Sequence, residues 1–269
     1  MCPLQKGGIN MNQQYVYNKK IFDSWNEKSA YLLGWLATDG CVQYVPNKRY
    51  GLRWELSDLD AIEMIKDILD SDYPIHKRNP GSGNLYSLYI RGKYITQRAI
   101  NLGISPKKSL TLKFPPVPKK QIKHFLRGVF DGDGSAFFLN RKEGKVLGTK
   151  FCGASKEFIQ KIGEILREEL EIIPKIYSEN NDSFWTLRYG ASESISLLKY
   201  LYEDCQYFLK RKQEILDEAL RINAGNKVAT CNRCGKEIVR VSNRQKWCKD
   251  CKIVVVREQD RKRRRTHDK

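Results

Sequence analysis

Two short segments of the sequence share a pattern that ends in an aspartate followed by a glycine. Residues 32–40 read LLGWLATDG, and residues 126–134 read LRGVFDGDG. In both copies a glycine is followed four residues later by a small residue, which places two small side chains one turn apart on one helix face. Because small residues let helix backbones approach closely, we expect this face to be a helix–helix interface. Its members are Gly34, Thr38, Gly128 and Gly132.

Asp39 and Asp133 would meet at one end of this interface if the two helices pair in parallel. Two adjacent carboxylates repel each other and raise each other's pKa unless a positive charge lies beside them. Mg²⁺ is usually held by one or two carboxylates plus water and phosphate oxygens, so the pair suits phosphodiester hydrolysis by metal-activated water. A single Asp-Gly pair is more simply a helix end followed by a turn. The recurrence with matched flanks favours a magnesium site at Asp39 and Asp133.

The flanking sequence predicts two similar halves. After each nonapeptide come two strands, a helix, two more strands and another helix, so each half reads αββαββα and the fold class is α+β. Leu52, Trp54 and Leu56 alternate with polar residues, as in a half-exposed antiparallel strand. The proline-containing segment 103–118 cannot be one helix and is the expected bridge between the halves. The expected helices are 59–69 and 156–170, and the expected later strands are 73–78, 85–91, 174–179 and 184–189.

The two nonapeptides resemble the signature of the LAGLIDADG homing endonucleases, in the single-chain form that carries two copies. The resemblance covers roughly residues 22–220 and extends to Ala30-Tyr31, to Ser-Pro-Lys-Lys at 105–108 and to residues 208–213. It implies that Asp39 and Asp133 bind the catalytic divalent metals below a saddle of two four-stranded sheets. One position differs, because the first copy has Ala37 where the second has Asp131, and we interpret Asp131 as structural.

The resemblance also implies that polar strand residues contact double-stranded DNA and that a basic side chain stabilises charge at the scissile phosphate. For the second role the sequence suggests Lys93 and Arg188. Side chains such as Arg, Lys and Gln can address base edges or phosphates. The expected DNA contacts in the sheets are Gln43, Arg53, Glu55, Arg78, Ser87, Lys150, Lys175 and Arg188.

Four cysteines near the C-terminus form two CxxC pairs with thirteen residues between them. This spacing is close to that of zinc ribbons, in which four thiolates hold one structural Zn²⁺. A redox CxxC is the alternative, but such motifs occur singly in a βαβ unit. The predicted Zn²⁺ ligands are Cys231, Cys234, Cys248 and Cys251.

The chain of 269 residues has 49 Lys and Arg against 31 Asp and Glu, a net charge of +18 that is typical of polyanion binding. No apolar run approaches the ~20 residues of a membrane span, and no secretory signal is evident. We therefore expect a cytoplasmic protein of a bacterial, phage-infected or organellar compartment. The last 45 residues hold 15 Lys or Arg against 5 Asp or Glu. Their basic tail, including Arg261, Arg263 and Arg264, is expected to bind phosphates.

These observations predict a monomeric, site-specific, Mg²⁺-dependent DNA endonuclease with a structural Zn²⁺ module. The alternatives are an intron-encoded RNA maturase of the same fold, with intron RNA as partner, and a catalytically inactive DNA-binding regulator. Retention of both aspartates argues against the regulator. The expected organisation is an arm (1–25), a first half (26–102), a linker (103–118), a second half (119–222), a zinc ribbon (227–255) and a basic tail (256–269).

Overall fold

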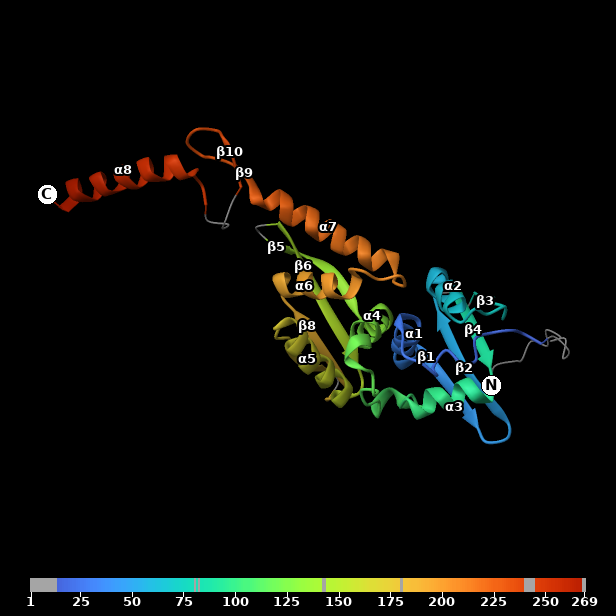
Figure 1. Cartoon of the computed structure of the whole chain (residues 1–269). Helices are drawn as coiled ribbons and strands as arrows, with labels where there is room; N and C mark the ends of the chain where they lie inside the picture. The colour runs from blue at the N-terminus through green and yellow to red at the C-terminus, as the bar shows by residue number, and fades with distance from the viewer. Residues whose placement is uncertain are drawn as a thin grey trace.

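The structure is a computed structural model that describes residues 14–79, 81, 83–141, 144–179, 181–239 and 245–267. Two similar halves lie side by side, and a long helix leads from the second half to the C-terminal module (Figure 1). The core is one cluster of buried apolar side chains that includes residues of both halves, among them Leu32 and Phe125.

The first half follows the predicted order of elements. Asn26 caps the first helix, because its side-chain oxygen accepts a hydrogen bond from the Ser29 backbone N–H at 2.9 Å. Asp58 caps the second helix in the same way. The elements are α1 (Glu27–Ala37), β1 (Gly40–Val45), β2 (Arg49–Leu56), α2 (Leu59–Ile68), β3 (His76–Arg78), β4 (Leu85–Arg91) and α3 (Lys93–Asn101).

The second half repeats this order after a linker that contains the short 3-10 helices η1 (Lys108–Leu110) and η2 (Lys119–Gln121). Ser155 caps its second helix by accepting a hydrogen bond from the Phe158 N–H at 3.3 Å. The elements are α4 (Ile122–Asp133), β5 (Ser135–Arg141), β6 (Gly144–Gly153), α5 (Lys156–Leu170), β7 (Lys175–Glu179), β8 (Phe184–Tyr189) and α6 (Ala191–Tyr202).

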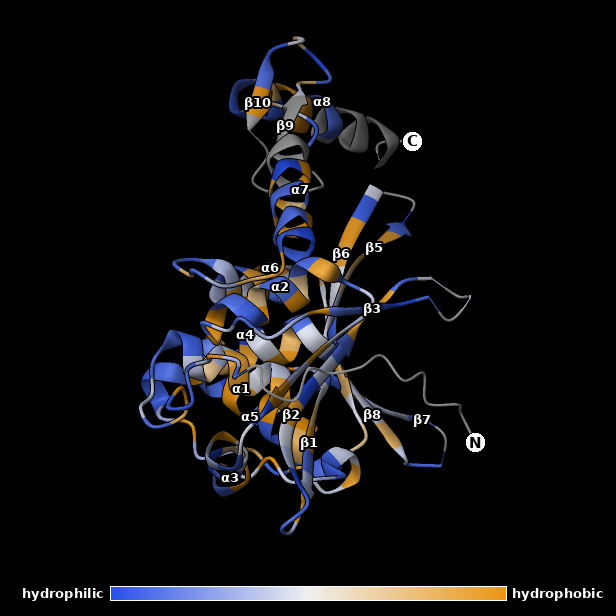
Figure 2. Ribbon diagram, turned by 90° about the vertical axis from the view of Figure 1, so that its right-hand side faces the viewer, coloured by the Kyte–Doolittle hydropathy of each residue, from blue (hydrophilic) through white to orange (hydrophobic). Residues whose placement is uncertain are grey.

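Each half contains one antiparallel sheet of four strands, in the orders β1-β2-β4-β3 and β5-β6-β8-β7. The strands alternate between buried and partly exposed residues, as in β2, where Leu52 and Trp54 are buried. The helices cover one side of the sheets, and the other side remains open (Figure 2). The predicted α+β fold with two four-stranded sheets is confirmed.

The C-terminal part differs in two details from the sequence prediction. Helix α7 (Lys210–Lys227) continues through Gly225, across the expected boundary between the second half (119–222) and the zinc ribbon (227–255). A single glycine costs a helix only about 1 kcal/mol, so a helix that is already formed can continue through it. The expected basic tail is the continuation of helix α8 (Lys249–His267), which follows the hairpin of β9 (Val228–Thr230) and β10 (Glu237–Val239).

No helix in the described part of the chain has the length and apolar character needed to cross a membrane.

Candidate metal centre and nucleic-acid interface

The two nonapeptides form α1 and α4, and these helices pack against each other along their small residues. A Cβ atom added to Gly34 would lie 2.7 Å from the Val129 nitrogen and 2.8 Å from the Gly128 Cα. A Cβ atom added to Gly128 would lie 3.1 Å from the Gly34 Cα. The contacts follow the same order along both helices, because Glu27 meets Arg127 and Thr38 meets Gly132 further along. The helices are therefore parallel, as the sequence predicts.

Parallel packing brings Asp39 and Asp133 to the same end of the interface. The Asp39 Oδ2 lies 3.2 Å from the position of a Cβ atom on Gly132, the neighbour of Asp133. Burial raises the pKa of Asp39, against the opposing charges of Lys212 and Lys108. Burial and then the charge of Asp39 raise the pKa of Asp133 to about 6. Within the described residues neither carboxylate forms an ion pair. A bound cation would therefore stabilise the negative charge of both carboxylates.

Two buried lysines lie close to these carboxylates, one for each half. The Lys108 Nζ donates hydrogen bonds to the carbonyls of Thr38 and Gly40, at 3.2 and 2.5 Å. Burial lowers the pKa of Lys108, whereas Cys41, Asp133 and Asp39 oppose this effect. Lys108 is therefore fixed at the backbone on both sides of Asp39.

Lys212 occupies the corresponding place in the second half. Its Nζ donates to the carbonyls of Asp131 and Gly134, at 2.9 and 2.7 Å, and to the carbonyl of Phe130. Burial lowers its pKa to about 8, with Asp131 the largest opposing influence. Because its pKa is lowered, the Lys212 ammonium beside the two carboxylates can stabilise negative charge on a bound group or transfer a proton near neutral pH.

Sequence reasoning missed both lysines as site residues, although it noted the segments that contain them. Lys93 and Arg188, which it favoured, are not among the cations that influence the pKa of Asp39 or Asp133. Lys93 begins α3 with its Nζ 5.8 Å from the centre of the Tyr50 ring, and Arg188 lies on β8 with its Cζ 5.6 Å from the centre of the Phe137 ring. The signal that could have identified the lysines is their repetition, because a Lys-rich segment follows the last helix of each half, at 105–108 and 208–213.

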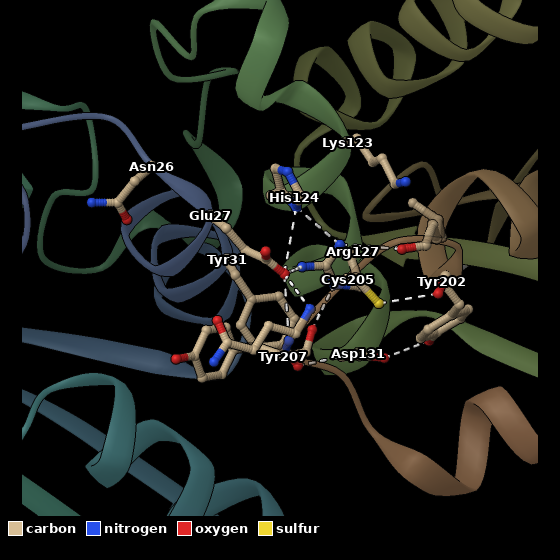
Figure 3. Close-up of polar contacts among 12 residues, drawn as sticks. Asn26, Glu27, Tyr31, Lys123, His124, Arg127, Asp131, Tyr202, Cys205 and Tyr207 are labelled. Carbon is tan, nitrogen blue, oxygen red and sulfur yellow. Dashed lines mark hydrogen bonds and ion pairs between the residues drawn. The ribbon is translucent and has the colours of Figure 1, made fainter.

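Asp131, the acidic residue without a counterpart in the first nonapeptide, is fully buried between α1 and α6, where it contacts Tyr31 and Tyr202 (Figure 3). It accepts hydrogen bonds from the hydroxyls of Tyr31 and Tyr202, at 2.7 and 2.5 Å, and from the Leu209 N–H at 3.0 Å. Burial raises its pKa, and the charge of Lys212 is the largest opposing effect. With three donors on its carboxylate, Asp131 connects α1, α6 and the start of α7.

Arg127 makes a second buried connection at the other end of the interface (Figure 3). Its guanidinium donates to Glu27 Oε1 at 2.6 Å and to the carbonyls of Tyr207 and Leu201, at 2.6 and 3.2 Å. The fully buried side chain thus joins the first turn of α1 to the segment between α6 and α7. A buried guanidinium needs such partners, because an unpaired buried charge is costly.

The predicted DNA contacts of the first half share one face of the sheet β1-β2-β4-β3. Gln43, Arg53 and Ser87 line a hollow of about 450 Å³ on this face. Glu55 lies beside them and pairs with Arg53 at 2.8 Å and with Arg78. In the other sheet Lys150, Arg188 and Lys175 lie in register across β6, β8 and β7. These candidates therefore lie on the faces of the two sheets opposite to buried core residues such as Trp54 and Leu187.

The four predicted zinc ligands meet where the turn of the β9–β10 hairpin faces the start of α8. The Sγ atoms of Cys231, Cys234, Cys248 and Cys251 all lie within 4.8 Å of one another. The Cys234 and Cys248 sulfurs are 3.9 Å apart, close to the ~3.8 Å that a tetrahedral site with Zn–S bonds of about 2.3 Å requires. Backbone N–H groups of Cys234 and Cys248 lower the pKa of Cys231 to about 6. The cluster is compatible with a closed structural zinc site.

Helix α8 is attached to this cluster by an ion pair. The Arg233 guanidinium contacts both carboxylate oxygens of Glu258, at 2.8 and 2.9 Å. The side chains of Arg261, Arg263 and Arg264 lie outside the described part of the structure.

Comparison with known proteins relates the second half to a protein family and identifies solved structures with the same fold. A family profile described as LAGLIDADG-like domain matches residues 120–218. The probable translation initiation factor IF-2 of Methanocaldococcus jannaschii is 26% identical over 220 residues, which are 77% of this chain and 17% of the relative. The uncharacterized protein MJ1054 of the same organism is 30% identical over 185 residues, 64% of this chain and 20% of the relative. The chain thus spans about a fifth of the length of these relatives.

Solved structures with the same fold include DNA complexes of the homing endonuclease I-WcaI, of the meganuclease I-SmaMI and of I-DmoI. I-WcaI bound to its recognition sequence has a TM-score of 0.55 at 14% identity and covers 78% of this chain and 95% of its own. I-SmaMI bound to uncleavable DNA has a TM-score of 0.52 at 14% identity, covering 74% and 92%. I-DmoI with DNA and Ca has a TM-score of 0.51 at 14% identity, covering 70% and 96%.

Proposed function

We propose that this chain, whose second half is a LAGLIDADG-like domain and whose fold is that of the LAGLIDADG homing endonucleases, is a divalent-metal-dependent nuclease that cuts both strands of a specific DNA site. The observation that carries the proposal is the placement of one carboxylate from each half, Asp39 and Asp133, at the shared end of α1 and α4. Similar folds bind DNA, one of them together with Ca.

Asp39 and Asp133 would hold the divalent cation, which fits two acidic groups without an ion-pair partner among the described residues. A bound cation would supply a Lewis acid and an activated water for attack on phosphorus. Lys108 and Lys212 would stabilise the negative charge that develops on the phosphate, one lysine for each strand. The carbonyls that each ammonium contacts fix its position before substrate binds.

The basic faces of the two sheets would position the duplex. Lys150, Lys175 and Arg188 form a row in the second sheet that begins beside Ser135, two residues after Asp133. Phosphate contacts from such a row would set the register of the duplex over the carboxylates. The cysteine module would bind structural Zn²⁺ and add DNA contacts outside the central site.

The test is a cleavage assay on a plasmid library that carries randomised inserts, with Mg²⁺ or with EDTA. Linear products that need Mg²⁺ support the proposal. Asp39→Asn and Asp133→Asn should each suppress cleavage while DNA binding persists, whereas Asp217→Asn, a change at an exposed aspartate on α7, should not. DNA binding without metal-dependent cleavage would indicate an inactive regulator, and selective binding of precursor RNA without DNA cleavage would indicate a maturase.

A further inference from the structure

The two sheets have the same pairing pattern, so their open faces can be compared position by position. Cys41 and Ser135 each follow a metal-site aspartate by two residues. Cys41 pairs with Arg53, and Arg53 with Tyr89. Ser135 pairs with Lys150, and that lysine with Arg188. Equivalent rows therefore start at the catalytic end of each sheet.

Beyond these rows the first sheet presents hydrogen-bonding groups. Gln43, Arg49 and His76 line the hollow on its open face. Glu55 contacts Arg53 at 2.8 Å and also pairs with Arg78. A guanidinium has five donors, so one carboxylate orients it and leaves other donors for a base edge. This face is suited to hydrogen-bond readout.

At four of the corresponding positions the second sheet carries apolar or weakly polar groups instead, whereas Glu179 stands in the place of Arg78. Phe137 stands where the first sheet has Gln43, each four residues after its aspartate and each paired with a glycine, Gly148 or Gly51. By the same pairing, Val146 replaces Arg49, Cys152 replaces Glu55 and Tyr177 replaces His76. Tyr177 is 43% exposed.

The Phe137 ring is held in place on the open face. A Cβ atom on Gly148 would lie 2.9 Å from the ring, so the glycine provides the space that the ring occupies. The Arg188 guanidinium lies 5.6 Å from the ring centre on the same face. Leu139 pairs directly with Val146. Its counterpart in the first sheet, Val45, is also apolar, so the two sheets differ at Phe137 and Val146 and not at this position.

We infer that the two half-sites are read by different chemistry: the half under β5–β8 through thymine methyl groups, and the half under β1–β4 through hydrogen bonds to base edges. The inference rests on the proposed DNA-binding function. In the major groove thymine is distinguished by its methyl group, which prefers apolar contact. Guanine presents two acceptors that match arginine. The target is therefore an asymmetric duplex, with required thymines in one half and required guanines in the other.

The experiment uses the full chain and a duplex selected from a randomised library by binding in Ca²⁺. Every dT of one half-site at a time is then replaced by dU, which removes only the methyl group. We expect affinity to fall about fourfold for each contacted methyl in one half and to stay unchanged in the other. Replacing dG by 7-deaza-dG, which lacks the N7 acceptor, should weaken binding in the opposite half.

Two matched variants assign the halves. Phe137→Ala should make the dU substitution nearly neutral, because the apolar contact is already lost. Gln43→Ala, the change at the equivalent position of the first sheet, should leave the dU effect intact. Equal dU effects in both halves, or a dU effect that Phe137→Ala does not reduce, overturn the inference while the proposed function stands. Failure to select any duplex overturns the proposed function and the inference with it.

Discussion

Asp39 and Asp133 come from different halves of the chain, yet the charge of Asp39 contributes directly to the raised pKa of Asp133. This coupling exists because Gly34 and Gly128 let the two helix backbones touch, so that both helices end at one place. The carboxylate pair is thus a product of helix packing, because each half contributes one of its two members.

The first prediction concerns pH. With a pKa of about 6 in the folded, metal-free protein, Asp133 is protonated at about pH 5, and a cation must displace that proton. Affinity for Ca²⁺ should therefore rise between about pH 5 and pH 7. The folded state also holds this proton more tightly than the unfolded state, so stability without metal should decrease as pH rises from about 4 to 6. Calorimetric titration with Ca²⁺ at several pH values between about 5 and 7 measures the change in affinity. An Asp39→Asn variant should shift the pH dependence downward, because the repelling charge is gone.

The second prediction separates Lys212 and Lys108 from Lys93. Lys212→Met or Lys108→Met should reduce cleavage by about 10²-fold or more, and a single variant should yield nicked rather than linear plasmid if each lysine serves one strand. Lys93→Met should cleave nearly as well as the unmodified chain. The ratio of nicked to linear product on a supercoiled plasmid reports the outcome. Strong loss in Lys93→Met with retained activity in Lys212→Met would reverse the assignment.

The third prediction concerns Asp131. Asp131→Asn should destabilise the fold by about 2–4 kcal/mol, because an amide cannot accept all three hydrogen bonds from Tyr31, Tyr202 and Leu209. Denaturant unfolding measures the loss. Ala37→Asp, which places the same acid at the equivalent buried position of α1, should also destabilise, since the sequence supplies no equivalent buried network there. A stable Asp131→Asn variant would show that the network is not structural.

The fourth prediction tests the contact between α1 and α4. Gly34→Ala should cost about 1–3 kcal/mol, because its Cβ atom would lie 2.7 Å from the Val129 nitrogen. The control is Gly163→Ala on α5, where a Cβ atom would lie 3.4 Å from Pro174, in ordinary contact. This change should be neutral or stabilise by up to about 1 kcal/mol, because alanine favours the helix. Thermal unfolding of both variants compares them directly.

The fifth prediction concerns the C-terminal module. Removing residues 228–269 should weaken DNA binding and flatten its dependence on salt, because fewer phosphates are neutralised. Cys248→Ser should release bound zinc and produce part of the same loss. Metal analysis and binding measured at several salt concentrations test both changes. An unchanged salt slope would exclude the module from DNA contact.

Much of the fold was predictable because its signals are local. The repeated nonapeptides predict paired helices and a shared acidic end, and alternation such as Leu52, Trp54, Leu56 predicts the strands. The lysines of the site were not predictable in the same way. Lys108 and Lys212 lie outside the repeated nonapeptides, and they bond backbone carbonyls next to the carboxylates through contacts more than 60 residues apart in sequence. Burial, which gives them their lowered pKa, is not visible in the composition of a segment.

Helix α7 starts directly after Leu209, which bonds Asp131, contains Lys212 in its first turn, and ends where the hairpin with Cys231 and Cys234 starts. A continuous helix of 18 residues is about 27 Å long, and each added residue turns whatever follows by about 100°. The spacing and the rotational angle between the carboxylate pair and the cysteine cluster are therefore set by the number of residues in one helix. Lengthening α7 by a full turn would move the module outward along the axis, whereas adding two residues would turn it towards the opposite side.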